Sequence, residues 1–126
     1  MLKNIILMVL VGGLAFAQTP KEILNENGCL SCHAIASKKL APAFAGIAMK
    51  NKRFEGANAK TVIINSIKNG SKGKFRRFSN TEMPAFPSIG EKDLSILADY
   101  ILSQSSKAKH FGQNHGGGMN RMGYNK

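Results

Sequence analysis

The stretch Cys29-Leu30-Ser31-Cys32-His33 decides how the rest of this chain is interpreted. Two cysteines separated by two residues and followed directly by histidine are typical of a site that attaches c-type haem. Each thiol can add to one vinyl group of the porphyrin, and the spacing lets both sulfurs reach the same edge of the macrocycle. His33 then lies under the iron and can offer an imidazole nitrogen as a ligand.

Three other chemistries compete for this motif. A thioredoxin-like redox dithiol uses the same cysteine spacing next to a βαβ pattern, which this sequence lacks. Structural zinc needs four ligands, whereas Cys29, Cys32 and His33 are three, and His110 and His115 lie in a remote tail. A disulfide that closes so short a loop would add little stability. The motif favours haem, and an exported thiol–disulfide oxidoreductase is the alternative function.

The N-terminus has the pattern of a secretory signal peptide. Lys3 supplies positive charge, an apolar run extends from Ile5 to Leu14, and Ala15-Phe16-Ala17 fits a small-x-small cleavage site. The apolar run is shorter than the roughly 20 residues that span a bilayer. We therefore expect residues 1–17 to be a cleaved signal peptide, with an uncleaved anchor as the alternative. The mature protein should lie in the periplasm without stable membrane insertion.

The composition is strongly basic. The chain has 18 Lys and Arg residues against 7 Asp and Glu residues, a formal net charge of +11, and loss of Lys3 with the signal peptide leaves +10. Such a surplus favours partners with acidic surfaces, membranes or nucleic acid. Because an exported protein rarely meets nucleic acid, we discount that partner.

The mature chain should form one small domain, residues 18–104, followed by a flexible tail. The tail, residues 105–126, is basic, contains no acidic residue, and is rich in Gly and Asn with scattered His and Met. This composition cannot build a core. The tail is interpreted as a flexible basic extension, and weak binding of copper or nickel is the alternative.

Helix signals begin directly after the expected cleavage site. Thr19, Pro20 and Glu22 form a capping-box pattern, and Gly28 ends the helix that follows. A second short helix is expected over residues 45–52, with Met49 as core filler. A third is expected to begin at the Asn58 cap and to end at Gly70 in left-handed conformation.

A last helix is expected after Gly90. Its apolar residues recur at the helical spacing i, i+3, i+4, i+7 and i+8, namely Leu94, Leu97, Ala98, Ile101 and Leu102. No period-two pattern of any length appears in the mature chain. The domain is therefore predicted to be all-α.

Two prolines mark where the rest of a ligand set is expected. A metal-bound histidine usually donates its other ring N–H to a carbonyl or carboxylate, and a carbonyl near Pro42 is the candidate acceptor for His33. The alternative is that Pro42 only shapes its loop. Further along, Pro84 restrains Met83 towards extended backbone, so the Met83 sulfur can be the sixth ligand of the iron.

The segment around Met83, residues 70–88, has no clear periodicity. A loop of this length in a small domain is usually functional or disordered. Its aromatic residues are expected to pack on the haem, namely Phe75, Phe78 and Phe86. Its basic residues are expected to form a solvated loop that can also surround the haem edge or meet its propionates, namely Lys72, Lys74, Arg76 and Arg77.

These features together resemble class I cytochrome c, and the short monohaem bacterial type most closely. The resemblance rests on the capped first helix, Cys29-x-x-Cys32-His33, Pro42, Met83-Pro84 and the amphipathic last helix. It implies an all-α fold in which three to four helices wrap around one covalently bound haem. It also implies that Cys29 and Cys32 bind the haem, that His33 and Met83 ligate the iron, and that the Pro42 carbonyl accepts from His33.

The resemblance implies a function as well. The protein would be a periplasmic electron carrier rather than an enzyme, moving one electron between redox partners with acidic docking surfaces, such as respiratory complexes, reductases or oxidases. This sequence departs from the family pattern at three positions. Leu24 stands where the family often has an aromatic residue, Phe75 where close relatives often have a tryptophan, and Phe86 where some relatives have an asparagine. A haem enzyme or gas sensor would follow if Met83 did not bind the iron.

Overall fold

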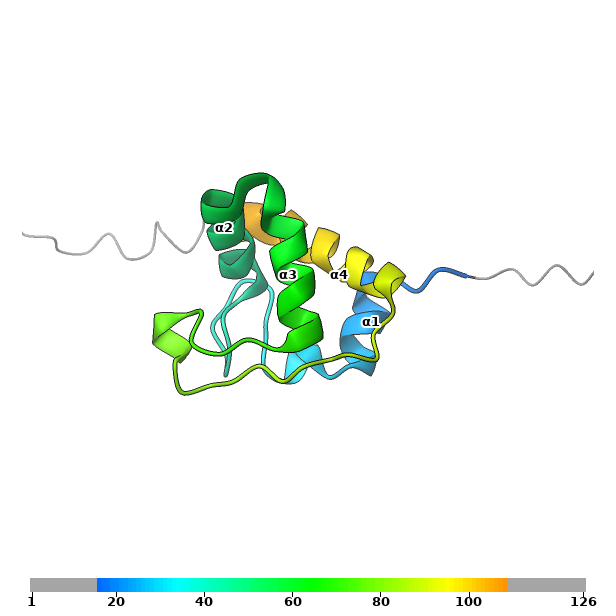
Figure 1. Cartoon of the computed structure of the whole chain (residues 1–126), viewed down its shortest axis with the longest axis horizontal. Coiled ribbons are helices and arrows are strands. Elements are labelled where there is room, and N and C mark those ends of the chain that lie inside the picture. Colours follow the sequence, from blue (N-terminus) through cyan, green and yellow to red (C-terminus); the bar gives the residue numbers. More distant parts are fainter. Residues whose placement is uncertain (1–15, 109–126) are drawn as a thin grey trace, which may run out of the picture.

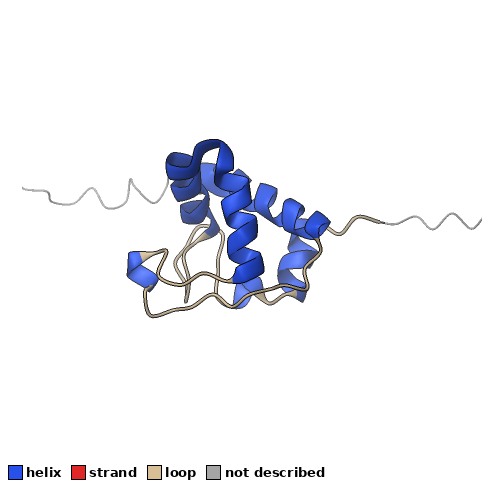
Figure 2. Ribbon diagram, in the orientation of Figure 1, coloured by secondary structure: helices blue, strands red, loops and turns tan. Residues whose placement is uncertain are grey.

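The computed structural model describes residues 16–108, and four α-helices are the main secondary structure of this part of the chain. They are α1 (Pro20–Glu26), α2 (Phe44–Glu55), α3 (Ala59–Asn69) and α4 (Glu91–Ser103) (Figure 1). No strand forms within residues 16–108 (Figure 2), although one isolated antiparallel bridge pairs Ser71 with Met83. The predicted all-α fold is confirmed. The expected signal peptide lies almost entirely outside the described residues.

Helix α1 begins with the predicted capping box. The Thr19 hydroxyl accepts a hydrogen bond from the Glu22 N–H at 3.3 Å, and the Glu22 carboxylate accepts one from the Thr19 N–H at 2.7 Å. The helix ends at Glu26, and Gly28 then takes a positive φ of 67°. This left-handed residue turns the chain into the 3-10 turn Cys29–Ser31, so the capped helix fixes where the first cysteine lies.

Helix α2 is longer than the expected 45–52, and one residue expected on its core-facing side is exposed. The prediction that Met49 fills the core is wrong, because 47% of this residue is exposed. The residues of α2 that the structure buries are Phe44, Ala45, Ala48 and Asn51. Met49 follows Ala48 directly, so the helical rotation of about 100° per residue turns it away from this face.

Helix α3 lies where it was expected, but both of its ends differ in detail. Asn58 has a helical backbone and makes no side-chain cap bond, because the 3-10 turn Gly56–Asn58 leads directly into the helix. Gly70 has the expected positive φ of 78°, but its ψ of 171° is not that of a left-handed helical cap. The chain therefore leaves α3 in an extended direction, toward the loop that carries Met83.

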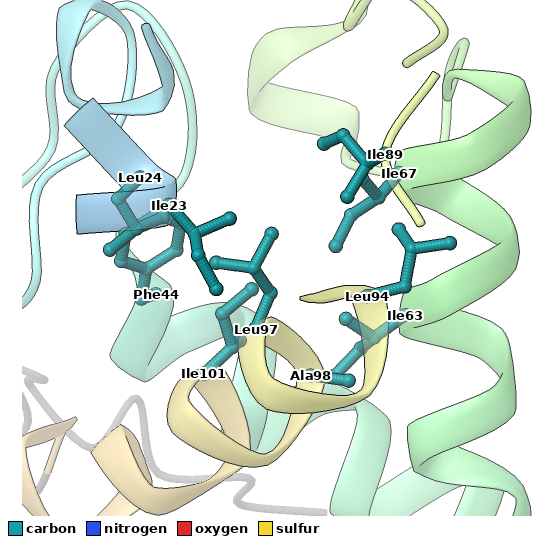
Figure 3. Close-up of a cluster of buried hydrophobic side chains, with 10 residues drawn as sticks. All are labelled: Ile23, Leu24, Phe44, Ile63, Ile67, Ile89, Leu94, Leu97, Ala98 and Ile101. Carbon is teal, nitrogen blue, oxygen red and sulfur yellow. The ribbon is translucent and has the colours of Figure 1, made fainter. Parts of the chain in front are cut away.

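The core lies where all four helices meet (Figure 3). Helix α4 packs against α1, α2 and α3 and contributes the largest share of the buried side chains. The core residues are Ile23 and Leu24 from α1, Phe44 from α2, Ile63 and Ile67 from α3, Ile89 before α4, and Leu94, Leu97, Ala98 and Ile101 from α4. The apolar face predicted for the last helix therefore packs against the other three helices and forms the centre of the core.

The packed domain extends further than the expected boundary at residue 104. A 3-10 helix, Gln104–Ala108, continues from α4 and packs against α2. Ala108 is buried, and the Lys52 ammonium donates to the Ser105 hydroxyl at 2.7 Å. These contacts order the first residues of what we expected to be a flexible tail. The remainder, with His110 and His115, lies outside the described residues.

The structure also bears on membrane insertion. Among residues 16–108, no helix is both long enough and apolar enough to cross a bilayer.

Candidate haem site

A cavity of about 390 Å³ lies beside the core, with α2, α3 and the 70–88 loop contributing to its walls. Its lining includes all five residues selected from the sequence, namely Cys29, Cys32, His33, Pro42 and Met83. These residues come from three separate parts of the chain, which the fold brings together. The volume is within the range of roughly 300–1,000 Å³ that is typical of pockets for small molecules and cofactors.

The two cysteines stand on a tight turn at one wall of this cavity. The N–H groups of Cys32 and His33 both donate to the Cys29 carbonyl, at 3.3 and 3.0 Å. Both thiols are free and half-buried. Burial raises the pKa of the Cys29 thiol, whereas a catalytic redox cysteine needs a lowered pKa. The turn therefore presents two thiols to one ligand, and burial disfavours the Cys29 thiolate that a dithiol oxidoreductase would use.

His33 is buried and held in one orientation. Its Nδ1 lies 2.7 Å from the Pro42 carbonyl oxygen, and its ring stacks on Phe44 with the centroids 5.0 Å apart. Because a carbonyl can only accept, Nδ1 carries the proton and Nε2 keeps its lone pair. Burial lowers the pKa of His33 and favours the neutral ring, although the Pro42 carbonyl opposes this. The expected hydrogen bond is present, and it leaves Nε2 able to bind a metal.

Met83 lines the same cavity and is held by the end of α3. It exchanges two backbone hydrogen bonds with Ser71, both 3.1 Å long. Three residues later, the Phe86 N–H donates to the Ile67 carbonyl at 2.9 Å. Met83 also packs against the core cluster. The 70–88 loop is therefore anchored to α3 on both sides of Pro84, which restricts where the Met83 sulfur can lie.

Two lysines add positive charge to the lining, and the sequence analysis identified only one of them. The Lys50 ammonium donates to the Lys74 carbonyl oxygen and lies 4.1 Å from the centroid of the Phe75 ring. The Lys74 ammonium donates to the Ser66 hydroxyl at 2.7 Å. Lys50 was not selected from the sequence. Helical spacing offered a signal for it, since it lies about one turn after Ile47 on the same cavity wall.

The other expectations for the loop divide into two groups. All three aromatic residues line the cavity, namely Phe75, Phe78 and Phe86. Of the four basic residues, only Lys74 is part of the lining. Lys72 pairs with Glu82 at 2.9 Å, and Arg76 and Arg77 are exposed on the 3-10 helix Arg76–Phe78. The basic residues of the loop therefore lie mostly on its outer surface.

The residues present fit a covalently bound haem. The cavity offers two free thiols, a neutral imidazole with an available Nε2, and a thioether sulfur. Its walls are mainly apolar, as a porphyrin requires. Its charged lining residues are Lys50, Lys74, Glu55 and Glu82, of which the two lysines can balance carboxylates. Fold and site together define a small helical protein of the c-type haem class.

Comparison with known proteins gives the family. The family model described as Cytochrome c matches residues 17–105, and the chain belongs to this family. It therefore carries one covalently attached c-type haem with iron, and its function is that of a haem electron carrier.

Individual relatives agree with this assignment. Cytochrome c-551 of Stutzerimonas stutzeri is 35% identical over 108 residues, which cover 82% of this chain and 98% of that protein. Cytochrome c-552 of Nitrosomonas europaea is 32% identical over 95 residues, covering 75% and 85%. The crystal structure of wild-type Nitrosomonas europaea cytochrome c552 matches with a TM-score of 0.58 at 30% identity, covering 67% of this chain and 98% of that one.

Proposed function

We propose that this chain is a periplasmic one-electron carrier in which His33 and Met83 are the two axial ligands of the haem iron. The observation that carries the proposal is that both side chains line the cavity that also holds Cys29 and Cys32. The bound haem supplies a ferric–ferrous couple, whose reduction potential is raised by methionine ligation. The chain supplies the attachment, the two ligands and the apolar walls.

The structure supports a carrier rather than an enzyme. With His33 and Met83 on the iron, neither axial position is open to a substrate. Both ligands are held by contacts with the backbone, His33 through the Pro42 carbonyl and Met83 through Ser71. Such supports keep the ligand set unchanged between oxidation states, so little reorganisation accompanies electron transfer.

The basic surface supports partners with acidic docking sites. The ion pairs formed within residues 16–108 are Lys60–Asp99, Lys68–Glu91 and Lys72–Glu82. Among the described residues, no acidic group lies within ion-pair distance of Lys74, Arg76 or Arg77. These three lie in the loop that carries Met83. Their uncompensated charge would steer an acidic partner toward the haem and raise the rate of encounter.

The pattern at residues 1–17 supports export, and the oxidising periplasm is where a mature chain of this kind would meet its partners. Thioether bonds to haem would protect Cys29 and Cys32 from oxidation to a disulfide there.

A pair of methionine variants tests the ligand assignment. Met83→Ala should open the sixth position of the iron, remove the sulfur-to-iron charge-transfer band of the oxidised protein, lower the reduction potential and allow cyanide to bind. Met49→Ala is the matched control, because Met49 is 47% exposed and lies outside the cavity lining. It should keep the wild-type band, potential and resistance to cyanide.

The opposite pattern would show that the wrong sulfur was chosen. If Met83→Ala retained the charge-transfer band, another group would occupy the sixth position, and the proposed ligand set would be incorrect.

A further inference from the structure

We propose that Gly70 is a positioning residue for Met83, because only glycine lets the backbone at Met83 approach the end of α3 as closely as it does. This inference rests on the proposed function, in which the Met83 sulfur binds iron. It assigns a role to a residue that lines none of the main haem cavity and bears no functional group.

The space around Gly70 excludes any side chain. A Cβ atom at this position would lie 2.7 Å from the Met83 carbonyl oxygen, 3.1 Å from the Ala85 nitrogen and 3.3 Å from the Pro84 carbonyl carbon. Non-bonded heavy atoms prefer separations of roughly 3.5–4.0 Å. All three neighbours are backbone atoms, which cannot rotate aside as the end of a side chain can. An added methyl group must therefore displace the segment 83–85.

That segment is the one that carries the proposed ligand. The Met83 carbonyl oxygen, which the methyl group would meet first, is also the acceptor for the Ser71 N–H at 3.1 Å. The Met83 N–H donates back to Ser71 at 3.1 Å, and the Phe86 N–H donates to Ile67 at 2.9 Å. Gly70 lies between these anchor points in the sequence. Displacement at Gly70 would therefore stretch the contacts that hold Met83 in place.

Gly56, at the end of α2, provides a control. Gly70 has φ +78° and ψ 171°, and Gly56 has φ +53° and ψ −120°, so alanine would strain the backbone at either position. A Cβ atom at Gly56, however, would meet no atom within 4 Å, and Gly56 lies outside the haem cavity lining. Gly56→Ala therefore carries a conformational cost without the clash, and the comparison of the two variants reports the effect of crowding on Met83.

The experiment compares Gly70→Ala and Gly56→Ala as haem-loaded proteins. Thermal unfolding, the sulfur-to-iron charge-transfer band, the reduction potential and cyanide affinity are measured for each. Both variants should unfold at lower temperature than the wild type. Only Gly70→Ala should lose most of the band, lower the potential and bind cyanide about tenfold or more tightly, since affinity follows the fraction of molecules with an open sixth position.

The proposal is overturned if Gly70→Ala matches Gly56→Ala in band, potential and cyanide affinity. If Met83 were not the ligand, the result would be different, because the Met83→Ala variant would then keep the charge-transfer band of the wild type. Should Gly70→Ala not fold, Gly70→Ala/Pro84→Gly replaces it, since glycine at position 84 frees the segment to move away. That double variant should show a weaker band than Pro84→Gly alone, whereas equal bands in the two would contradict the proposal.

Discussion

Two leucines of α4 separate the stability of the core from the environment of the haem. Leu97 is 1% exposed and lines the haem cavity, whereas Leu94 is fully buried in the core but lies outside the cavity lining. Both belong to the same helix and the same cluster (Figure 3). Replacing each by alanine removes the same atoms from two positions that differ mainly in their contact with the haem site.

The expected loss of stability is similar for both variants. Leu→Ala substitutions in well-packed cores cost about 3–5 kcal/mol. For a domain of this size, each kcal/mol lowers the melting temperature by roughly 4–8 °C, so even the lower limit corresponds to a fall of roughly 12–24 °C. Circular dichroism of the haem-loaded proteins measures this shift.

The reduction potential should distinguish the two. The apolar shell of a metal site controls its access to water and therefore its potential. Leu97→Ala opens space at the haem wall, admits water that stabilises the more highly charged ferric state, and should lower the potential. Leu94→Ala should leave the potential near the wild-type value. Equal shifts in both variants, or no shift in Leu97→Ala, would refute the placement of the haem against α4.

Three further predictions follow from other parts of the structure. The hydrogen bond from the Thr19 N–H lowers the pKa of the Glu22 carboxyl. The ionised carboxylate therefore stabilises the folded state above its ordinary pKa of 4.5, and this stabilisation is lost as the pH falls through the lowered pKa. Glu22→Gln should melt at a lower temperature than the wild type at pH 7, and the two melting temperatures should converge in acid. Cys29→Ala/Cys32→Ala should be largely unfolded by far-ultraviolet circular dichroism, since short helices around an unfilled cavity are marginal, and a cooperative helical apoprotein would contradict this. Electron transfer to the physiological partner should slow with added salt, which screens charges beyond about 10 Å at 0.1 M. It should slow further in Arg76→Glu with an unchanged haem spectrum, because Arg76 is exposed and lies outside the cavity lining. Indifference of the rate to salt would exclude electrostatic docking.

Much of the fold could be predicted because its signals are local. The capping box at Thr19 and Glu22 and the apolar period of α4 depend on residues a few positions apart, and both appear in the structure as expected. The haem motif is similarly short, so Cys29, Cys32 and His33 could be selected together. Even the Pro42 carbonyl could be anticipated, because a ligating histidine needs a partner for its second nitrogen.

The features that were missed depend on contacts between distant segments. Nothing near Gly70 in the sequence shows that its α-carbon faces the backbone of Met83, and nothing near Lys50 shows that it reaches the Lys74 carbonyl. Met49 was assigned to the core because its side chain is apolar, but α2 buries the face that carries Phe44, Ala45 and Ala48, and Met49 lies off this face. The packed end of the domain at Ala108 was missed for a similar reason, since α2, which is distant in the sequence, provides most of its contacts.

The central claim is that His33 and Met83 bind the haem iron, and nuclear magnetic resonance of the reduced protein tests it most directly. The chain contains six methionines, and a methyl group bound above the porphyrin is shifted far upfield by the ring current. With methionine methyl groups labelled with ¹³C, the account predicts one such resonance in the wild type, retained in Met49→Ala and absent from Met83→Ala. An upfield methyl that persists in Met83→Ala, or the lack of any shifted methyl in the wild type, would contradict it.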